Sequence, residues 1–183
     1  MDISYDFLRN NLYSRFDAVR YAYTYGITPN PKYRYFQGHA DGGGDCTNFI
    51  SQCLKAGGAP MDYSGTWAWW YNNKSTDNLY DDSWSVTWSV ANSLYWCLKS
   101  RYQLKLPGLK ALEVQDLDLL ELGDIIQYEN FRGFIYHSAI ITAFTYNGGI
   151  RIPLITQHTF DAINTSYIKP AAKRMHFMKI IVN

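Results

Sequence analysis

GGGDCTNFISQCLKAGGAP, residues 42–60, has the pattern of a helix with both of its ends marked. Asp45 is a favoured N-cap residue, and Gly57 stands where a glycine commonly ends a helix. Four apolar side chains recur between them at helical spacing and share one face: Phe49, Ile50, Cys53 and Leu54. The stretch predicts a helix over about residues 45–56, with Cys46 in its first turn.

Cys46 stands where the first turn of this helix presents free N–H groups and a partial positive charge. Both favour a thiolate over a thiol, and the same N–H groups can stabilise the oxyanion of an attacked carbonyl. Asp45 has the opposite charge effect, so an imidazolium is needed close to the sulfur. The preceding glycines let backbone or substrate approach closely. We therefore expect a reactive thiol with a depressed pKa.

Length, composition and charge bear on the number of domains and on binding to nucleic acids or membranes. The chain has 183 residues, of which 47% are hydrophobic, and this suits a single domain over residues 1–183. The net charge of +1 is spread without runs, so no nucleic-acid partner is expected. We find no apolar stretch long enough for an integral membrane segment and no signal peptide at the start. We expect a soluble protein, either cytoplasmic or released to the cell wall.

The three cysteines, Cys46, Cys53 and Cys97, lack the pair spacing of a metal site. Cys46 and Cys53 would lie about 10 Å apart along one helix, too far for a disulfide. We expect Cys53 and Cys97 to be core residues, with neither a metal nor an organic cofactor.

The rest of the chain predicts an α+β fold with N-terminal helices packed on a C-terminal antiparallel sheet. Helical spacing recurs in residues 13–25 and 85–100. Short β-type runs separated by turn residues follow at 125–130, 137–146 and 150–159. Helices first and strands last is the order typical of the α+β class.

The last two runs are joined by an Asn-Gly pair, residues 147–148, which is a strong hairpin signal. If these two residues form the loop, His137 lies directly opposite His158 on the face toward the cysteine helix. A register slip of one residue would bring Gln157 or Thr159 to this position instead. The predicted hairpin therefore places near Cys46 either two histidines or one histidine and a polar neighbour.

Tryptophans are dense in the segment WAWWYNN, residues 67–73, and just after it. Their flat faces suit stacking on a sugar, although lining of the core or of a cleft is the favoured role. We take Trp67 and Trp84 as candidate substrate contacts, together with Asp45 beside the thiol.

Five blocks of the sequence, in this order, carry a family resemblance: GGDCTNFISQCLKAGGAPM, SWSVTWSVANSLYWCL, LGDIIQYEN, YHSAIIT and ITQHT. They resemble the putative amidase domains of bacteria, relatives of the NlpC-type and CHAP cysteine peptidases in the papain-like group. The likeness covers about residues 13–175. It implies a papain-like cysteine peptidase fold with a triad in which Cys46 is the nucleophile, His137 the general base and acid, and His158 the group that orients the imidazole.

The resemblance implies a thiol-dependent hydrolase of amide or peptide bonds that uses no cofactor. By association with its relatives, the substrate would be a peptide or amide link of the cell wall, with peptidoglycan as the candidate. Two alternatives stay open: acyl transfer by the same triad, in which an amine replaces water, and a wall glycan or peptide-binding module without turnover.

Overall fold

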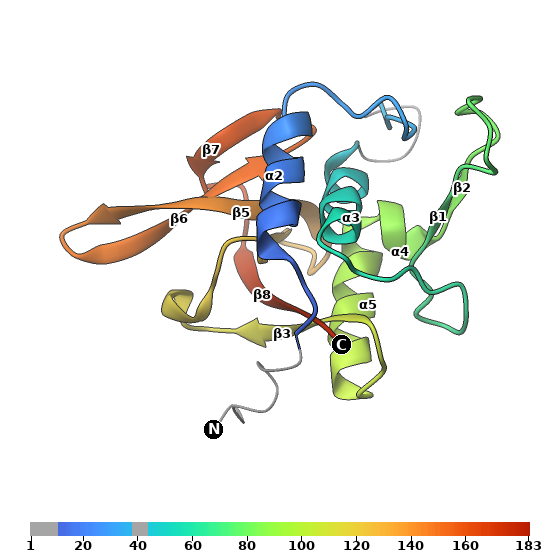
Figure 1. The fold of residues 1–183 in the computed structure, drawn as a ribbon. Coiled ribbons are helices and arrows are strands. Elements are labelled where there is room, and N and C mark those ends of the chain that lie inside the picture. Colours follow the sequence, from blue (N-terminus) through green and yellow to red (C-terminus); the bar gives the residue numbers. More distant parts are fainter. Residues whose placement is uncertain (1–10, 38–43) are drawn as a thin grey trace.

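The structure, a computed structural model, describes residues 11–37 and 44–183, so Gly42 and Gly43 of the glycine run lie outside the described residues. The elements are shown in Figure 1 and are, in chain order: α2 Arg15–Tyr25, α3 Cys46–Ala56, β1 Tyr71–Asn72, β2 Ser83–Trp84, α4 Val86–Ser89, α5 Ala91–Gln103, β3 Leu109–Val114, the 3-10 turn η1 Leu117–Leu119, β4 Ile125–Glu129, β5 Ile135–Asn147, β6 Ile150–Gln157, β7 Ala162–Ser166 and β8 Arg174–Val182.

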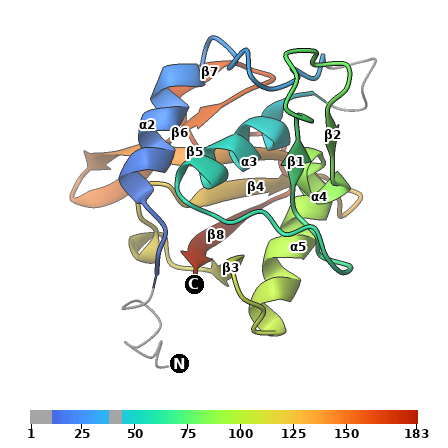
Figure 2. The ribbon, with the colours of Figure 1, turned by 45° about the vertical axis from the view of Figure 1, so that its right-hand side comes forward.

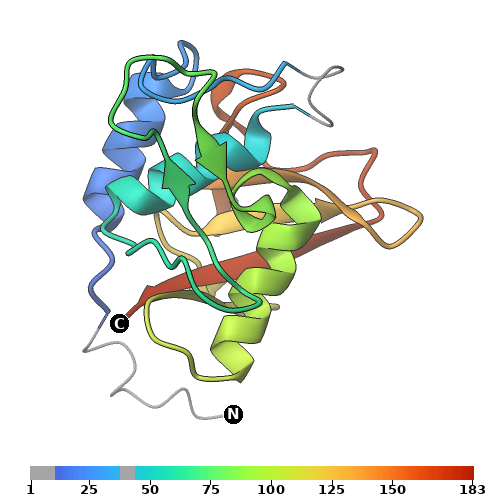
Figure 3. The same ribbon diagram turned by 90° about the vertical axis from the view of Figure 1, so that its right-hand side faces the viewer.

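Six strands form one antiparallel sheet in the order β3-β8-β4-β5-β6-β7, and β1 pairs with β2 separately. Helices α2, α3 and α5 pack on one side of the large sheet (Figures 2 and 3). The predicted α+β architecture, with helices packed on an antiparallel sheet, is confirmed. In the described part of the chain, no helix combines the length and the apolar character needed to cross a membrane.

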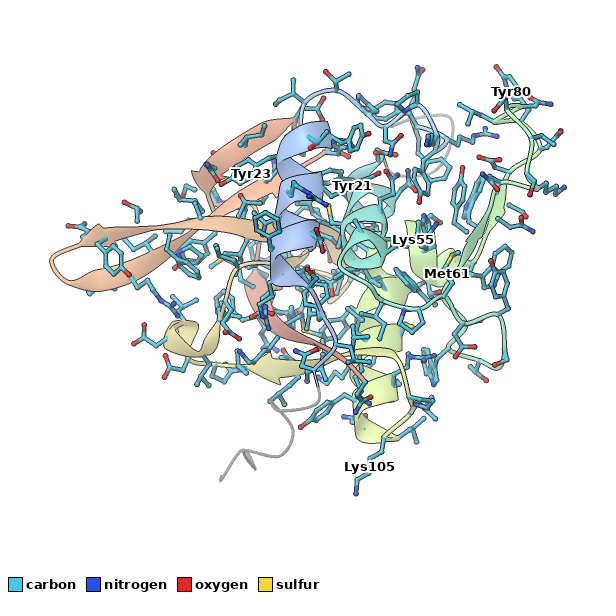
Figure 4. The ribbon with its side chains drawn as sticks, in the orientation of Figure 1. Tyr21, Tyr23, Lys55, Met61, Tyr80 and Lys105 are labelled. Atoms are coloured by element: carbon cyan, nitrogen blue, oxygen red, sulfur yellow. The ribbon has the colours of Figure 1, made fainter. Side chains whose placement is uncertain are left out.

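Helix α3 begins at Cys46, as its sequence predicts, and every residue from 46 to 54 is buried. Such burial requires partners for the polar side chains as well. Tyr21 points from α2 toward α3 (Figure 4), and its hydroxyl donates to Gln52 Oε1 at 2.7 Å. Trp88 Nε1 donates to Asn48 Oδ1 at 2.8 Å. The helix is therefore held on several sides by specific hydrogen bonds, which fixes the position of its first residue.

The single helix predicted over residues 85–100 is wrong. The segment forms two helices, α4 and α5, because Val90 between them is extended, with φ −112° and ψ 123°. The break lies at Val90 and Ala91, which line the same cavity as Cys46.

The loop of the β5–β6 hairpin is shifted by one residue from the predicted pair 147–148. It consists of Gly148 and Gly149, with φ values of 57° and 83°, and Asn147 pairs with Ile150. Positive φ at both loop residues is what a type I′ turn requires, and two glycines adopt it without steric cost.

A bulge between residues 141 and 143 shifts the register again, so that Ile140 pairs with Thr156. The predicted register, which set His137 directly opposite His158, is therefore wrong. Since successive side chains of a strand point to opposite faces, a shift of this size decides which side chain of β6 reaches the histidine.

Two hydrophobic clusters form the core. The larger one contains Trp69 and Trp88 and joins the helices to the sheet. The smaller one contains Ile126, Ile141 and Ile155 from three neighbouring strands. Because β4 and β5 contribute to both clusters, packing on one side of the sheet depends on packing on the other.

Candidate active site

A cavity with a volume of about 330 Å³ opens at the start of α3. Cys46 is 4% exposed and borders this cavity, whereas Cys53 and Cys97 are fully buried in the core, as expected. All three thiols are free. The other residues known to line it, all from the described ranges, are uncharged: Phe36, Gly44, Thr47, Trp84, Ser89, Val90, Ala91, Ile135 and Tyr136.

Gly44 makes the approach to Cys46 possible. Its φ is +91°, and a Cβ atom at this position would stand 2.5 Å from Thr159 Oγ1. Thr159 itself has a φ of 76°, which is strained for a β-branched residue. The start of α3 and the β6–β7 turn are thus packed so closely that only glycine fits.

Asp45 is 1% exposed and bonds within the protein, so the expected role as a substrate contact is not supported by its position. Its Oδ1 accepts from the backbone N–H of Phe36 at 3.0 Å and from Asn48 Nδ2 at 2.7 Å. Its side chain makes no hydrogen bond to the N-terminus of α3. The N–H groups of the first turn are therefore left uncapped by Asp45.

His158 is bonded away from His137. Its Nδ1 lies 2.6 Å from Asp45 Oδ2, and its Nε2 lies 2.7 Å from the carbonyl oxygen of Tyr25. Each ring nitrogen of His158 thus faces a buried hydrogen-bond acceptor. The Phe49 ring stacks on it at a centroid distance of 4.0 Å. His158 therefore ties the start of α3 to the end of α2.

His137 pairs with Gln157, the polar alternative that the sequence had left open. His137 Nε2 lies 3.0 Å from Gln157 Oε1. Gln157 Nε2 donates to the carbonyl of Phe160 at 2.7 Å, and this fixes which way the amide faces. The amide oxygen must then accept from an Nε2–H group of the imidazole. In the neutral ring, Nδ1 carries the free lone pair.

The pKa of His137 is lowered to about 4, mainly because burial disfavours the charged ring. The hydrogen bond to Gln157 raises this pKa, and the positive charge of Lys169 lowers it further. His137 is therefore a neutral base at every pH well above 4.

The pKa of the Cys46 thiol is raised above its ordinary value, so the expected depression is wrong for this structure. Burial is the largest cause. Hydrogen bonds from the Thr47 hydroxyl, whose Oγ1 lies 3.6 Å from the sulfur, and from the backbone N–H of Ser138 act in the opposite direction, while the Asp45 charge adds to the rise. An imidazolium beside the sulfur would lower the pKa of the thiol, but His137 is neutral. The site therefore holds a thiol together with a neutral imidazole.

On strand β5, His137 lies between residues that line the cavity and a residue that bonds Cys46. Ile135 and Tyr136, which precede it, line the cavity, and the backbone of Ser138, which follows it, bonds the Cys46 sulfur. The Ser138 hydroxyl also lies 3.3 Å from Thr47 Oγ1. The first turn of α3 thus meets β5 at Ser138, the residue that follows the histidine.

The two candidate tryptophans have different positions. Trp84 lines the cavity, with its ring 4.7 Å from that of Phe36. Trp67 packs against the core, where its carbonyl accepts from Arg101 Nη1 at 3.1 Å. The structure brings Trp84 to Cys46 and leaves Trp67 outside the cavity lining. The sequence reasoning missed Phe36 and Tyr136, whose positions depend on long-range packing and carry no local signal.

Within residues 11–37 and 44–183, no group of three or more His, Cys, Asp or Glu side chains is placed to hold a metal ion.

Comparison with known proteins gives two kinds of match. The sequence profile of the putative amidase domain matches residues 12–181. The chain is 34% identical over 152 residues to the uncharacterized protein YhbB of Bacillus subtilis (strain 168), which covers 82% of the chain and 42% of that protein. It is 30% identical over 140 residues to the uncharacterized protein YjcM of the same strain, covering 72% of the chain and 28% of that protein. The chain thus spans less than half the length of these relatives, and no solved structure shows a significant match.

Proposed function

The chain belongs to the putative amidase domain family, and from this premise we propose that it is a thiol-dependent amide hydrolase with Cys46 as the nucleophile. The family description suggests amide hydrolysis. One observation carries the assignment of residues: His137, with its tautomer set by Gln157, lies in the strand that borders the cavity beside Cys46.

His137 is proposed as the general base for Cys46. The sulfur accepts a hydrogen bond from the backbone N–H of Ser138. A backbone N–H group of a strand lies in the plane of the sheet, and this one follows His137 directly in the chain. From there the lone pair on His137 Nδ1 can take the thiol proton as the sulfur attacks an amide carbonyl. A neutral imidazole suits this step, because its free lone pair can accept the thiol proton while the sulfur attacks the carbonyl.

The tetrahedral oxyanion is proposed to bind at the first turn of α3. The side chain of Asp45 does not cap these N–H groups, so they can donate to the oxyanion, and the helix dipole favours its charge. His137 then returns the proton to the leaving amine, which departs and leaves a thioester on Cys46. Water, activated by the same imidazole, hydrolyses the thioester and restores the thiol.

In this proposal Gln157 orients the imidazole, the role that the sequence assigned first to His158. The order of a cysteine at a helix start, a histidine in a strand and a polar residue in the next strand supports a papain-like arrangement related to the NlpC-type and CHAP peptidases. The substrate is proposed to be a peptide or amide link of the bacterial cell wall, on the strength of that kinship alone.

The test is digestion of purified bacterial sacculi, with mass spectrometry to identify the bond that is cut. The chain and the Cys97→Ala variant, altered at a core cysteine that does not line the cavity, should release the same fragments. Cys46→Ala should release none, and His137→Ala should be slower by about 10²- to 10⁴-fold. Retained hydrolysis in folded Cys46→Ala would exclude the thiol mechanism. Cleavage of small amides but not of sacculi would exclude only the cell-wall substrate.

A further inference from the structure

Lys169 lies on the segment between β7 and β8, next to the catalytic histidine of the proposed mechanism. Its Nζ is 5.3 Å from the ring centroid of Tyr128 and 5.7 Å from that of Phe160. The same two rings flank His137, at centroid distances of 5.6 Å and 6.1 Å. The ammonium is thus held by cation–π contacts on the rings that border the imidazole.

This ammonium is half-buried, and within the described part of the chain it takes part in none of the salt bridges. Burial lowers the pKa of Lys169, and a negative charge on the Cys46 sulfur would raise it. A positive charge that is partly desolvated and lacks a carboxylate partner is well suited to bind an anion.

The position of Lys169 defines which part of a substrate it meets. Among the residues that the structure describes, those that line the cavity beside Cys46 are uncharged, which suits the acyl portion of an amide. The leaving amine must approach His137, because this residue donates its proton. In an amide made with an α-amino acid, one carbon atom separates the amide nitrogen from the carboxylate. Such a carboxylate would therefore lie on the His137 side, where Lys169 is found.

We propose that Lys169 binds a carboxylate on the leaving-group side of the scissile amide, so that the enzyme prefers bonds whose amine portion is an amino acid with a free carboxylate. This inference rests on the proposed function and adds a substrate class to it.

The experiment compares two alkylating reagents of similar size on Cys46, followed by mass spectrometry of the cysteine peptides. Iodoacetate carries a carboxylate and iodoacetamide does not. The ratio of their second-order rate constants reports attraction of an anion to the site and cancels any change in the reactivity of the sulfur. We expect Lys169→Met to lower this ratio about fivefold. Lys169→Arg, which keeps the charge, should retain it within about twofold.

Lys173→Met is the matched control, because Lys173 is an exposed lysine of the same segment. Its ratio should equal that of the unaltered chain. An unchanged ratio in Lys169→Met, or an equal loss in Lys173→Met, would overturn the inference and leave the thiol mechanism standing. If Cys46 instead alkylates no faster than the two core cysteines, the proposed function itself fails.

Discussion

Gln157 and His158 are neighbours in the chain, yet their side chains bind different partners. Gln157 holds the ring of His137, while His158 makes a buried hydrogen bond to Asp45. Because only the first contact reaches the proposed chemistry, the two residues should respond differently to truncation. Truncation of Gln157 should affect catalysis, and truncation of His158 should affect the stability of the fold.

Gln157→Ala is expected to lower turnover by about 10- to 100-fold, since the imidazole loses the group that fixes its orientation. Its free energy of unfolding should fall by only about 1 kcal/mol. His158→Ala should lower the free energy of unfolding by about 3 kcal/mol, because it leaves two buried acceptors, Asp45 Oδ2 and the Tyr25 carbonyl, without their partner. Urea unfolding and turnover per folded molecule measure both. A loss of turnover in His158→Ala together with normal turnover in Gln157→Ala would show that His158 orients the imidazole.

His137 should also make stability depend on pH. Its pKa in the folded chain is about 4, below the ordinary value of about 6.5. Between these two pH values the unfolded chain is protonated at this histidine and the folded chain is not. Stability contributed by the neutral ring is complete above pH 6.5 and is lost as the pH falls toward 4, at about 1.4 kcal/mol per pH unit. His137→Gln should show a shallower decline in urea unfolding between pH 6.5 and 4.5. Equal slopes would contradict the buried neutral ring.

The sequence marks Cys46 and His137 as candidates because both stand in local patterns, a helix start and a strand start. The choice between Gln157 and His158 depends on the register of β6 against β5. That register is set by the position of the hairpin loop and by the bulge in β5. The two adjacent glycines after Asn147 were the available signal, since either Asn-Gly or Gly-Gly can form the loop. The raised pKa of Cys46 could not be predicted, because burial is a property of the whole fold.

At the scale of elements, the joint between α3 and the β6–β7 turn positions the nucleophile. Gly44→Ala would place a methyl group against Thr159 and would also strain the backbone, whose φ is +91°. We expect the start of α3 to shift and turnover to fall by about tenfold or more, because small displacements of a nucleophile are costly.

A second variant separates these two causes. Thr159→Gly removes the side chain that the new methyl group meets and relieves the positive φ of Thr159. Turnover of the Gly44→Ala/Thr159→Gly double variant should therefore exceed that of Gly44→Ala. Strictly additive effects in the double-mutant cycle would show that the contact does not position Cys46.

Elements with a regular apolar pattern were predictable, and those held by distant partners were not. Helices α2 and α3 and strands β4, β5 and β6 agree with the sequence pattern. Strand β3 was missed, because its residue Lys110 is buried through bonds to the Leu106 carbonyl and to Asn183 Oδ1. The short strands β1, β2 and β7 depend on pairing with neighbours and have no strong pattern of their own.

At the scale of the whole molecule, the sheet joins segments that are far apart in the chain. Strand β8, near the end of the sequence, lies between β3 and β4, and the backbone N–H of Leu12 bonds the carbonyl of Val182 at 2.7 Å. The expectation of one domain over residues 1–183 therefore predicts a single cooperative unfolding transition.

Ile141→Val tests this cooperativity, because Ile141 belongs to the smaller cluster, whereas the buried tryptophans Trp69 and Trp88 belong to the larger one. The substitution should lower the free energy of unfolding by about 1 kcal/mol. Tryptophan fluorescence and far-ultraviolet circular dichroism should report the same shift of the urea midpoint. A shift seen by circular dichroism alone would indicate two independently folding parts.

The central claim is that Cys46 is a nucleophile served by His137, and site-resolved alkylation at pH 7.5 measures it most directly. Cys46 borders the cavity, whereas burial raises the pKa of Cys97 to about 12 and that of Cys53 well above its ordinary value. Iodoacetamide should modify Cys46 first and abolish turnover in proportion, and His137→Ala should slow this modification by about tenfold or more. Modification of all three cysteines at one rate, or full turnover after Cys46 is modified, would contradict the account.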